Sequence, residues 1–346
     1  MSVASTPSQV DPGLLAAARG GSEGAFRRIV EEHRSELLAH CYRMLGSLQD
    51  AEDALQETFL RAWRGLPQFE ARSSMRTWLH TIATNACLSA IARRPKRTLP
   101  IDSGEPSPPT QDPGQPLVET VWVEPYPDET FGVPEERDQP DARFEQREAL
   151  ELAFIAALQH LSGNQRAVLI LREVLGFSAR EVSESLDTSV ASVNSALVRA
   201  RKTVDACLPD RSQQETLRSL GDRRIRKLVR AYVDAWQRGD VGAVAALLAE
   251  DVTFSMPPWA SWWRGRETIA GFATAAVEFC ADARAVPTRA NAQPAIAYYS
   301  LDEQSGRYKA SAIDVLTFEG ALIKDITAFI SPDLFRHFAL QPELAE

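Results

Sequence analysis

The residues SLQDAEDALQETF at positions 47–59 decide how the first part of the chain folds. Apolar side chains recur there at spacings of three and four, which is the pattern of one buried stripe along a helix. The members of this stripe are Leu48, Ala51, Leu55 and Phe59. Ser47 precedes the stripe and begins a capping-box pattern whose fourth residue is Asp50, so we expect the helix to start there.

A second face of the same helix carries acids and an amide. Its members are Asp50, Asp53, Gln56 and Glu57. Such a face suits the basic helices of a partner protein, because opposite charges make charge-assisted contacts and speed the encounter. The alternative is a solvated face whose acids only stabilise the helix N-terminus.

Helical patterns continue on both sides of this segment. Ser22 is placed to cap one helix that runs as far as Cys41, and a further helix is expected over about residues 76–91. Helices over 178–186 and 189–206 are separated by a short break, which is the shape of a helix-turn-helix. The side chains expected to face the core from the second of these are Val193, Leu197, Ala200 and Val204.

The charge of the chain is unevenly distributed. A net charge of −9 over 346 residues argues against a nucleic-acid-binding protein, because DNA phosphates attract clustered Lys and Arg. Residues 101–142, however, hold eleven acidic residues, one basic residue and nine prolines. Prolines exclude a helix or a paired strand, so this segment is predicted to be an extended acidic linker. Residues 1–100 carry a net charge of +3.

Several classes of protein are disfavoured by the composition. No apolar run approaches the roughly 18 residues that span a bilayer, and the polar N-terminus lacks the features of a signal peptide. The four cysteines and five histidines show no metal-binding spacing. We therefore expect a cytoplasmic protein with no metal, no cofactor and no contact with a membrane.

The last part of the chain has a different pattern of predicted secondary structure. A long amphipathic helix ends near Trp236, and a second helix spans 241–249. Short β-type runs follow at 252–256, 295–300, 308–318 and 321–330. Helices followed by an antiparallel sheet form an α+β pattern.

The first two blocks resemble the extracytoplasmic-function branch of the sigma-70 family of RNA polymerase sigma factors. The resemblance rests on residues 50–59, on 69–85 (FEARSSMRTWLHTIATN), and on 161–166 with 189–202. It implies two all-α domains, a region 2 helical bundle and a region 4 helix-turn-helix. The implied partners are core RNA polymerase, through the largest-subunit clamp helices and the flap region, and promoter DNA. Residues Asp50, Asp53, Gln56 and Glu57 would bind the polymerase.

The resemblance also implies two sites for DNA. The unstacked minus-ten strand would be held by Phe69, Arg72, Ser73, Ser74, Arg76 and Asn85, which supply the aromatic surface, polar donors and cations that single-stranded DNA requires. Trp78 is open to two interpretations, core residue or stacking platform. The minus-thirty-five duplex would be read by Ser192, Asn194, Ser195 and Arg199, with Asn194 suited to adenine and Arg199 to guanine or phosphate.

The last block resembles the SnoaL-like, NTF2-like fold, a cone of helices on a curved sheet. The resemblance rests on residues 240–252 and 263–269, and in the linker on Trp122–Pro127, which looks like a tryptophan and proline motif of sigma factors with this extension. It implies regulation in cis through a contact of Trp122 and Pro125. Candidate residues for a pocket that holds an unidentified small ligand are Trp259, Trp263, Tyr298 and Asp314.

Taken together, the sequence predicts a multidomain sigma factor. The expected domains are region 2 at 14–97, the acidic linker at 98–142, region 4 at 143–208 and the SnoaL-like domain at 222–340. The expected function is promoter recognition with core polymerase, without catalysis and with no catalytic residues. Two alternatives remain: a DNA-binding regulator that does not engage the polymerase, and an isomerase or cyclase activity in the C-terminal domain.

Overall fold

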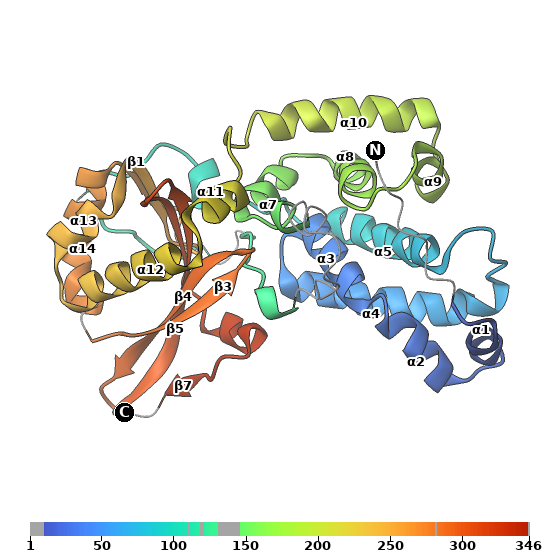
Figure 1. The fold of residues 1–346 in the computed structure, drawn as a ribbon, viewed down its shortest axis with the longest axis horizontal. Helices are drawn as coiled ribbons and strands as arrows, with labels where there is room; N and C mark the ends of the chain where they lie inside the picture. The colour runs from blue at the N-terminus through green and yellow to red at the C-terminus, as the bar shows by residue number, and fades with distance from the viewer. Residues whose placement is uncertain (1–9, 110, 118–120, 131–145, 281, 345–346) are drawn as a thin grey trace. The chain divides into compact units, whose positions relative to one another are not determined.

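Two compact units make up the chain (Figure 1). The computed structural model describes residues 10–109, 111–117, 121–130, 146–280 and 282–344. Within these, the first unit comprises residues 10–96 and 157–208, and the second comprises the described parts of 97–130 together with 146–156 and 209–344. The remainder of the predicted acidic linker, 131–142, lies outside the described residues.

The first unit begins with a helical bundle. Its helices are α1 (Pro12–Arg19), α2 (Glu23–Glu31), α3 (Arg34–Leu45), α4 (Leu48–Gly65) and α5 (Met75–Ile91), with a 3₁₀ turn, η1 (Leu66–Gln68), after α4. The helix predicted from Ser22 to Cys41 is in fact two, because the chain leaves the α-helix after Glu31 and starts again at Arg34. Helix α4 begins as predicted, and the Ser47 hydroxyl accepts the Asp50 N–H at 3.1 Å.

The second part of the first unit is the predicted helix-turn-helix. Its elements are α8 (Gly163–Leu169), a π-helix η4 (Ile170–Val174), α9 (Ala179–Ser185) and α10 (Val190–Asp205). Before them, α7 (Leu152–Gln159) belongs to the second unit up to residue 156 and to the first unit from residue 157. In α9 the Ser178 hydroxyl accepts the Glu181 N–H, while the Glu181 carboxylate accepts the Ser178 N–H, which satisfies two free helix-end donors. The four α10 residues predicted to face the core are all buried, which confirms the register of that helix.

The second unit is a helix-covered sheet. Its helices are α11 (Gln213–Leu220), α12 (Asp222–Gln237), α13 (Val241–Ala246) and α14 (Arg266–Cys280). Its strands are β1 (Leu248–Ser255), β2 (Trp262–Arg264), β3 (Arg284–Ala290), β4 (Gln293–Asp302), β5 (Arg307–Glu319), β6 (Leu322–Phe329) and β7 (Glu343–Leu344). The described strands are ordered β2-β1-β6-β5-β4-β3, and β7 pairs with β5. The expected antiparallel sheet is mixed, because β1 pairs with β6 in parallel.

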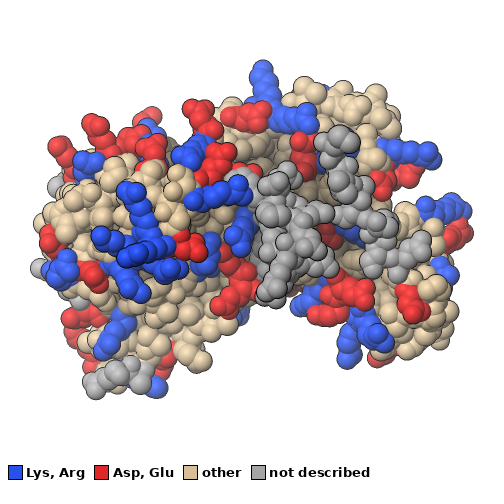
Figure 2. Space-filling view, in the orientation of Figure 1, with Lys and Arg blue, Asp and Glu red and all other residues tan. Residues whose placement is uncertain are grey.

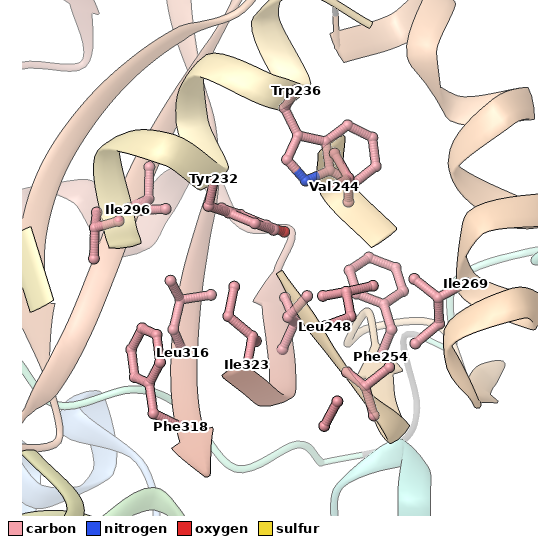
Figure 3. Close-up of a cluster of buried hydrophobic side chains, with 14 of the residues drawn as sticks. Tyr232, Trp236, Val244, Leu248, Phe254, Ile269, Ile296, Leu316, Phe318 and Ile323 are labelled. Atoms are coloured by element: carbon pink, nitrogen blue, oxygen red, sulfur yellow. The ribbon is translucent and has the colours of Figure 1, made fainter. Parts of the chain in front are cut away.

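The core of this unit lies between the helices and one face of the sheet. Figure 3 shows Tyr232 and Trp236 of α12 facing Leu248, Leu316 and Ile323 of the strands. Tyr232 and Leu248 are completely buried. The amphipathic pattern of α12 is therefore explained by a single apolar face that is packed on the sheet.

Residues 97–130 also belong to the second unit. Most of the described part has no regular secondary structure, with 3₁₀ turns η2 (Pro100–Asp102) and η3 (Asp128–Thr130) near its ends. A further 3₁₀ segment, η5 (Pro332–Phe338), follows the last long strand. Among the described residues, no helix is both long and apolar enough to cross a membrane.

Candidate functional site

A cavity of about 400 Å³ opens in the helical bundle of the first unit. Three neighbouring elements form it, namely the end of α4, the η1 turn and the outer face of α5. The residues that line it are Arg61, Gly65, Gln68, Phe69, Trp78, Ile82 and Asn85. Trp78, Ile82 and Asn85 follow one another at spacings of four and three, so they lie on one face of α5.

Two aromatic rings form one wall of this cavity. The Phe69 and Trp78 ring centroids are 4.8 Å apart, with an angle of 34° between the rings. Gly65 permits this arrangement, because a Cβ at that position would lie 3.3 Å from Trp78 Cζ2. The Arg19 guanidinium donates to the Phe69 carbonyl and lies 5.8 Å from the ring, which fixes the backbone of the loop.

The chemistry of the cavity suits a single flat heterocycle. Its volume is at the lower end of the range for small-ligand pockets. Aromatic rings stack on any nucleobase, and amides read the hydrogen-bonding edge of an unstacked base. The Asn85 side chain is exposed on α5 and Gln68 is exposed on η1, so both amides are accessible.

Only two of the six predicted minus-ten residues, Phe69 and Asn85, line this cavity. Ser74 is used as the N-cap of α5, where its hydroxyl accepts the Thr77 N–H at 3.0 Å. Arg72 and Ser73 are exposed, and Arg72 is paired with Glu70. Sequence reasoning missed Arg61, Gly65, Gln68 and Ile82, because only the fold brings the end of α4 beside α5.

Arg76 is directed away from the cavity. Its Nε donates to both carboxylate oxygens of Glu36, at 3.0 and 3.1 Å. It also donates to the Leu175 carbonyl at 3.2 Å and lies 4.9 Å from the centre of the Phe177 ring. These partners come from α3 and from the helix-turn-helix part of the same unit, so Arg76 joins the two parts in this structure.

The helix-turn-helix part packs on a second face of α5. The Thr81 and Ser185 hydroxyl oxygens are 2.7 Å apart, and Thr77 donates to Glu181 at 3.4 Å. Beneath this contact the His80 ring meets the Phe177 ring edge-on at 5.5 Å. Burial lowers the pKa of His80 to about 4, so this ring is neutral near pH 7.

The acidic face of α4 is only partly free. Asp53 and Gln56 are exposed, and Glu57 is paired with Arg61 at 2.7 Å. Asp50 is 8% exposed and forms an ion pair with Arg94, which comes from the basic run after α5. Three of the four predicted polymerase-binding residues are thus accessible without a rearrangement of the bundle.

The predicted minus-thirty-five residues all lie on the exposed side of α10. They are Ser192, Asn194, Ser195 and Arg199. Between them Val198 is 66% exposed, which is unusual for a large apolar side chain in a helix. A helix with polar and apolar side chains on its outer face can make both hydrogen bonds and methyl contacts in a major groove.

Trp122 and Pro125 of the linker are both buried. Trp122 pairs with Thr98 of the linker itself, and its carbonyl accepts from Arg97. The contact with the sheet is made one residue after Pro125, where the Tyr126 N–H donates to Asn291 Oδ1 at 2.9 Å and the Tyr126 carbonyl accepts the Asn291 N–H at 2.8 Å.

The four pocket residues predicted in the C-terminal block lie in different surroundings. Trp263 is fully buried against Phe272, with 4.3 Å between the ring centroids. The Trp259 indole donates to the Gly114 carbonyl of the linker at 2.9 Å. Tyr298 is half-buried, and burial raises the pKa of Asp314 to about 7. Among the described residues, no group of acids, histidines or cysteines is arranged to hold a metal.

A basic surface that sequence reasoning did not single out lies on α12. Figure 2 shows Lys and Arg side chains gathered over this helix. Its exposed cations are Arg223, Arg224, Arg226, Lys227 and Arg230. The near-neutral charge of the whole block had concealed this local excess.

Comparisons with known proteins match three parts of the chain to known families. Residues 29–97 match Sigma-70 region 2, residues 151–204 match Sigma-70 region 4, and residues 229–326 match the SnoaL-like domain family. The chain is 39% identical over 329 residues to the ECF RNA polymerase sigma factor SigG of Mycobacterium tuberculosis, which covers 93% of this chain and 85% of that protein.

Two further comparisons cover different lengths of the chain. The ECF RNA polymerase sigma-E factor of Escherichia coli is 27% identical over 195 residues, covering 56% of this chain and 92% of that protein. The crystal structure of the extracytoplasmic function sigma factor SigJ of Mycobacterium tuberculosis aligns with a TM-score of 0.60 and 21% identity, covering 91% of this chain and 99% of that one. The alignment with SigJ shows that a similar fold, over most of this chain, occurs in a solved structure.

Proposed function

The chain belongs to the extracytoplasmic-function sigma factors with a SnoaL-like extension, and from this we propose how its parts share the work of transcription initiation. The bundle that contains α4 and α5 binds core RNA polymerase and captures the melted minus-ten strand. Helix α10 reads the minus-thirty-five duplex. The C-terminal domain regulates these steps in cis and performs no catalysis. The protein acts in the cytoplasm, where it meets RNA polymerase.

The cavity between α4 and α5 carries the minus-ten part of this proposal. It combines an aromatic wall, two accessible amides and a cation at its rim, in a volume that suits one base. An unstacked base that enters it would exchange stacking in the duplex for stacking on Trp78 and Phe69. Strand capture is then favoured only when the DNA has opened, which is what initiation requires.

The polymerase part rests on the exposed residues Asp53 and Gln56 and the half-buried Glu57 of α4. An acidic helix face pairs with the basic clamp helices implied by the family. Asp50 supports this face from below, because its ion pair with Arg94 holds the start of α4 against the end of α5. We therefore assign Asp50 a positioning role in polymerase binding.

The regulatory part rests on the linker. The described residues 97–130 form one compact unit with the C-terminal domain, and Tyr126 hydrogen-bonds to Asn291 of that domain. The segment that joins region 2 to region 4 is therefore also bound to the C-terminal domain. A change in the C-terminal domain, including the binding of an unidentified small ligand, would alter the range of conformations that the linker can adopt.

The test of the minus-ten assignment uses two half-buried tryptophans of the same bundle. Trp78→Ala removes the stacking wall of the cavity, whereas Trp63→Ala removes a matched side chain that packs on Phe26 away from it. We expect Trp78→Ala to lower open-complex formation with core polymerase on a library of promoter fragments by 5- to 150-fold, because stacking contributes about 1–3 kcal/mol per base.

Trp63→Ala is expected to lower open-complex formation much less, once both variants are corrected for folded fraction by circular dichroism. Equal losses in the two variants would show that the cavity does not hold the promoter strand. If the wild-type chain initiates transcription on none of the library fragments, the sigma-factor assignment itself is contradicted.

A further inference from the structure

A proline-rich stretch of the linker is held against the C-terminal domain. We call the described part of residues 104–117 the linker strap; Thr110 within it lies outside the described residues. Its sequence GEPSPPTQDPGQPL contains five prolines in fourteen residues. Most of its side chains are exposed, so the strap lies on the surface of the domain and is not part of its core.

Tryptophans of one short loop bind the strap through its backbone. The indole N–H groups of Trp262, Trp263 and Trp259 donate to the carbonyls of Gly104, Pro108 and Gly114, at 3.0, 3.1 and 2.9 Å. The Ser261 hydroxyl donates to the Pro113 carbonyl at 3.1 Å. All four donors come from residues 259–263, so one segment of the domain meets the strap along most of its length.

Two backbone hydrogen bonds fix the register of the strap. The Ser107 N–H donates to the Trp262 carbonyl at 2.6 Å, and the Leu117 N–H donates to the Pro258 carbonyl at 2.9 Å. Gly271 of α14 contributes the close approach at the centre, because a Cβ at that position would lie 3.0 Å from Pro109 Cβ. The surface is thus shaped for a proline at this point of the strap.

Indole donors that bind the backbone carbonyls of a proline-rich segment are also used by proteins that recognise proline-rich peptides. Proline has no N–H and its φ is fixed before binding, so less conformational entropy is lost when the strap is held. The strap also turns at its centre, where the Gln111 N–H donates to the Pro108 carbonyl at 3.1 Å. Aromatic side chains that donate to those carbonyls form the walls of such sites. The strap and the tryptophan loop supply the two halves of this arrangement.

We infer that the surface formed by Trp259, Ser261, Trp262, Trp263 and Gly271 is a binding site for a proline-rich peptide. Its occupant in the intact chain is the linker strap. The inference does not depend on promoter recognition, because every contact that carries it lies within the second unit. Because occupant and site are joined covalently, the strap competes with any free peptide at an effective concentration in the millimolar range.

The test replaces the strap in the full chain with a Gly/Ser sequence of equal length and adds a fluorescein-labelled peptide of residues 104–117. We expect fluorescence anisotropy to show saturable binding to the strap-replaced chain and at least tenfold weaker binding to the wild-type chain, whose own strap fills the site. A peptide with alanine at its five prolines is expected to bind at least fivefold more weakly.

Two substitutions in the strap-replaced chain locate the site. Trp259→Phe keeps the ring but removes the indole donor, and Gly271→Ala places a methyl group where Pro109 lies; each is expected to weaken peptide binding about fivefold or more. Trp63→Phe, in the other unit, is the control and should change nothing. Failure of the peptide to bind, equal binding to the wild-type chain, or insensitivity to both substitutions would overturn the inference.

A second measurement applies if the strap-replaced chain does not fold. In the otherwise unmodified chain, hydrogen exchange of the Ser107 and Leu117 amides reports directly on strap binding. We expect Trp259→Phe and Gly271→Ala each to speed exchange at Leu117 and Ser107 several-fold without changing exchange in α10. Unchanged exchange at both amides would contradict the assignment.

Discussion

Glu151 is a buried acid that has no cationic partner among the residues described by the structure. Its carboxylate accepts the N–H groups of Gln213 and Gln214 at 3.1 and 2.7 Å, and so caps the start of α11. Burial raises the pKa of Glu151 to about 7, although the two amide donors oppose this change. Relative to the charged form, the protonated form of Glu151 is therefore more favoured in the folded chain than in the unfolded chain.

This shift predicts the sign of a pH effect. A raised pKa contributes stability that is complete below the unfolded value of 4.5 and is lost as pH rises through about 7. The loss amounts to about 3 kcal/mol at 1.4 kcal/mol per pH unit. Glu151→Gln should remove this part of the pH dependence, so its stability relative to wild type rises between pH 5 and pH 8.

Urea unfolding of the full chain, followed by tryptophan fluorescence at both pH values, measures this difference. Glu215→Gln, which removes an exposed carboxylate from the same helix, is the control and should leave the wild-type pH dependence in place. If the stability of Glu151→Gln relative to wild type does not change with pH, the carboxylate does not titrate as inferred.

At the scale of residues, local chemistry could be predicted and long-range polar contacts could not. Ser22 and Ser47 cap the helices that follow them, as their sequence patterns indicate. The side chains of Asn291 and Gln293, however, accept the backbone N–H groups of Tyr126 and Leu152, which lie more than 140 positions earlier in the chain. An isolated amide in a sequence gives no sign of such a partner.

The proposed contact of α10 with the minus-thirty-five duplex depends on which of its residues are exposed. Arg199 lies on the outer face with Asn194, whereas the nearby Arg201 is paired with Glu173 at 2.7 Å. Arg199 has no ion-pair partner among the described residues, so its guanidinium can bind either phosphate or the edge of guanine. The two cases differ in their dependence on salt and on sequence.

Arg199→Ala is expected to weaken binding of the holoenzyme to the minus-thirty-five element. If Arg199 reads guanine, the loss is about 1–3 kcal/mol and specificity at one position relaxes. If it binds phosphate, the loss is uniform and the slope of log affinity against log salt falls by about one. Footprinting and salt titration distinguish these cases. Arg28→Ala removes an equal exposed charge from α2, and a loss as large in that variant would rule out a specific role for Arg199.

At the scale of elements, periodicity predicted the helices better than the sheet. The stripe of α10 is buried as expected, because its repeat is long enough to fix one face. Strand β2 has three residues and β3 contains Pro287, so neither carries a sufficient alternating pattern. The parallel pairing of β1 with β6 joins strands about seventy residues apart and depends on the whole sheet.

At the scale of the whole molecule, the acidic linker has a more specific role than its charge indicated. Its excess of acid distinguished it as a separate segment, yet the strap is held by backbone carbonyls and prolines, while Glu105 and Asp112 remain exposed. Composition could therefore predict that the described part of the segment forms no long helix or strand. It could not predict the tryptophan loop that binds it, because that loop lies some 150 residues further along the chain.

If α5 and α10 bind the two promoter elements as proposed, the packing of the helix-turn-helix on α5 must be lost when the protein binds a promoter. The minus-ten and minus-thirty-five elements are about 25 base pairs apart, which is about 85 Å of duplex at 3.4 Å per base pair. Helices α5 and α10 belong to one compact unit here, and Thr81 of α5 touches Ser185 of α9. Both elements cannot be read in this arrangement, so the contact between α5 and α9 defines a closed state.

A reversible crosslink at that contact tests this conclusion. The two hydroxyl oxygens are 2.7 Å apart, so Thr81→Cys with Ser185→Cys, in a Cys207→Ser background, brings two sulfurs within bonding range. We expect the oxidised double variant to lose promoter-dependent transcription at least tenfold and to recover when reduced, because only the reduced chain can open. The single-cysteine variants, treated alike, should transcribe at the same level before and after reduction. Undiminished transcription by the fully oxidised double variant would show that promoter recognition does not require this contact to open.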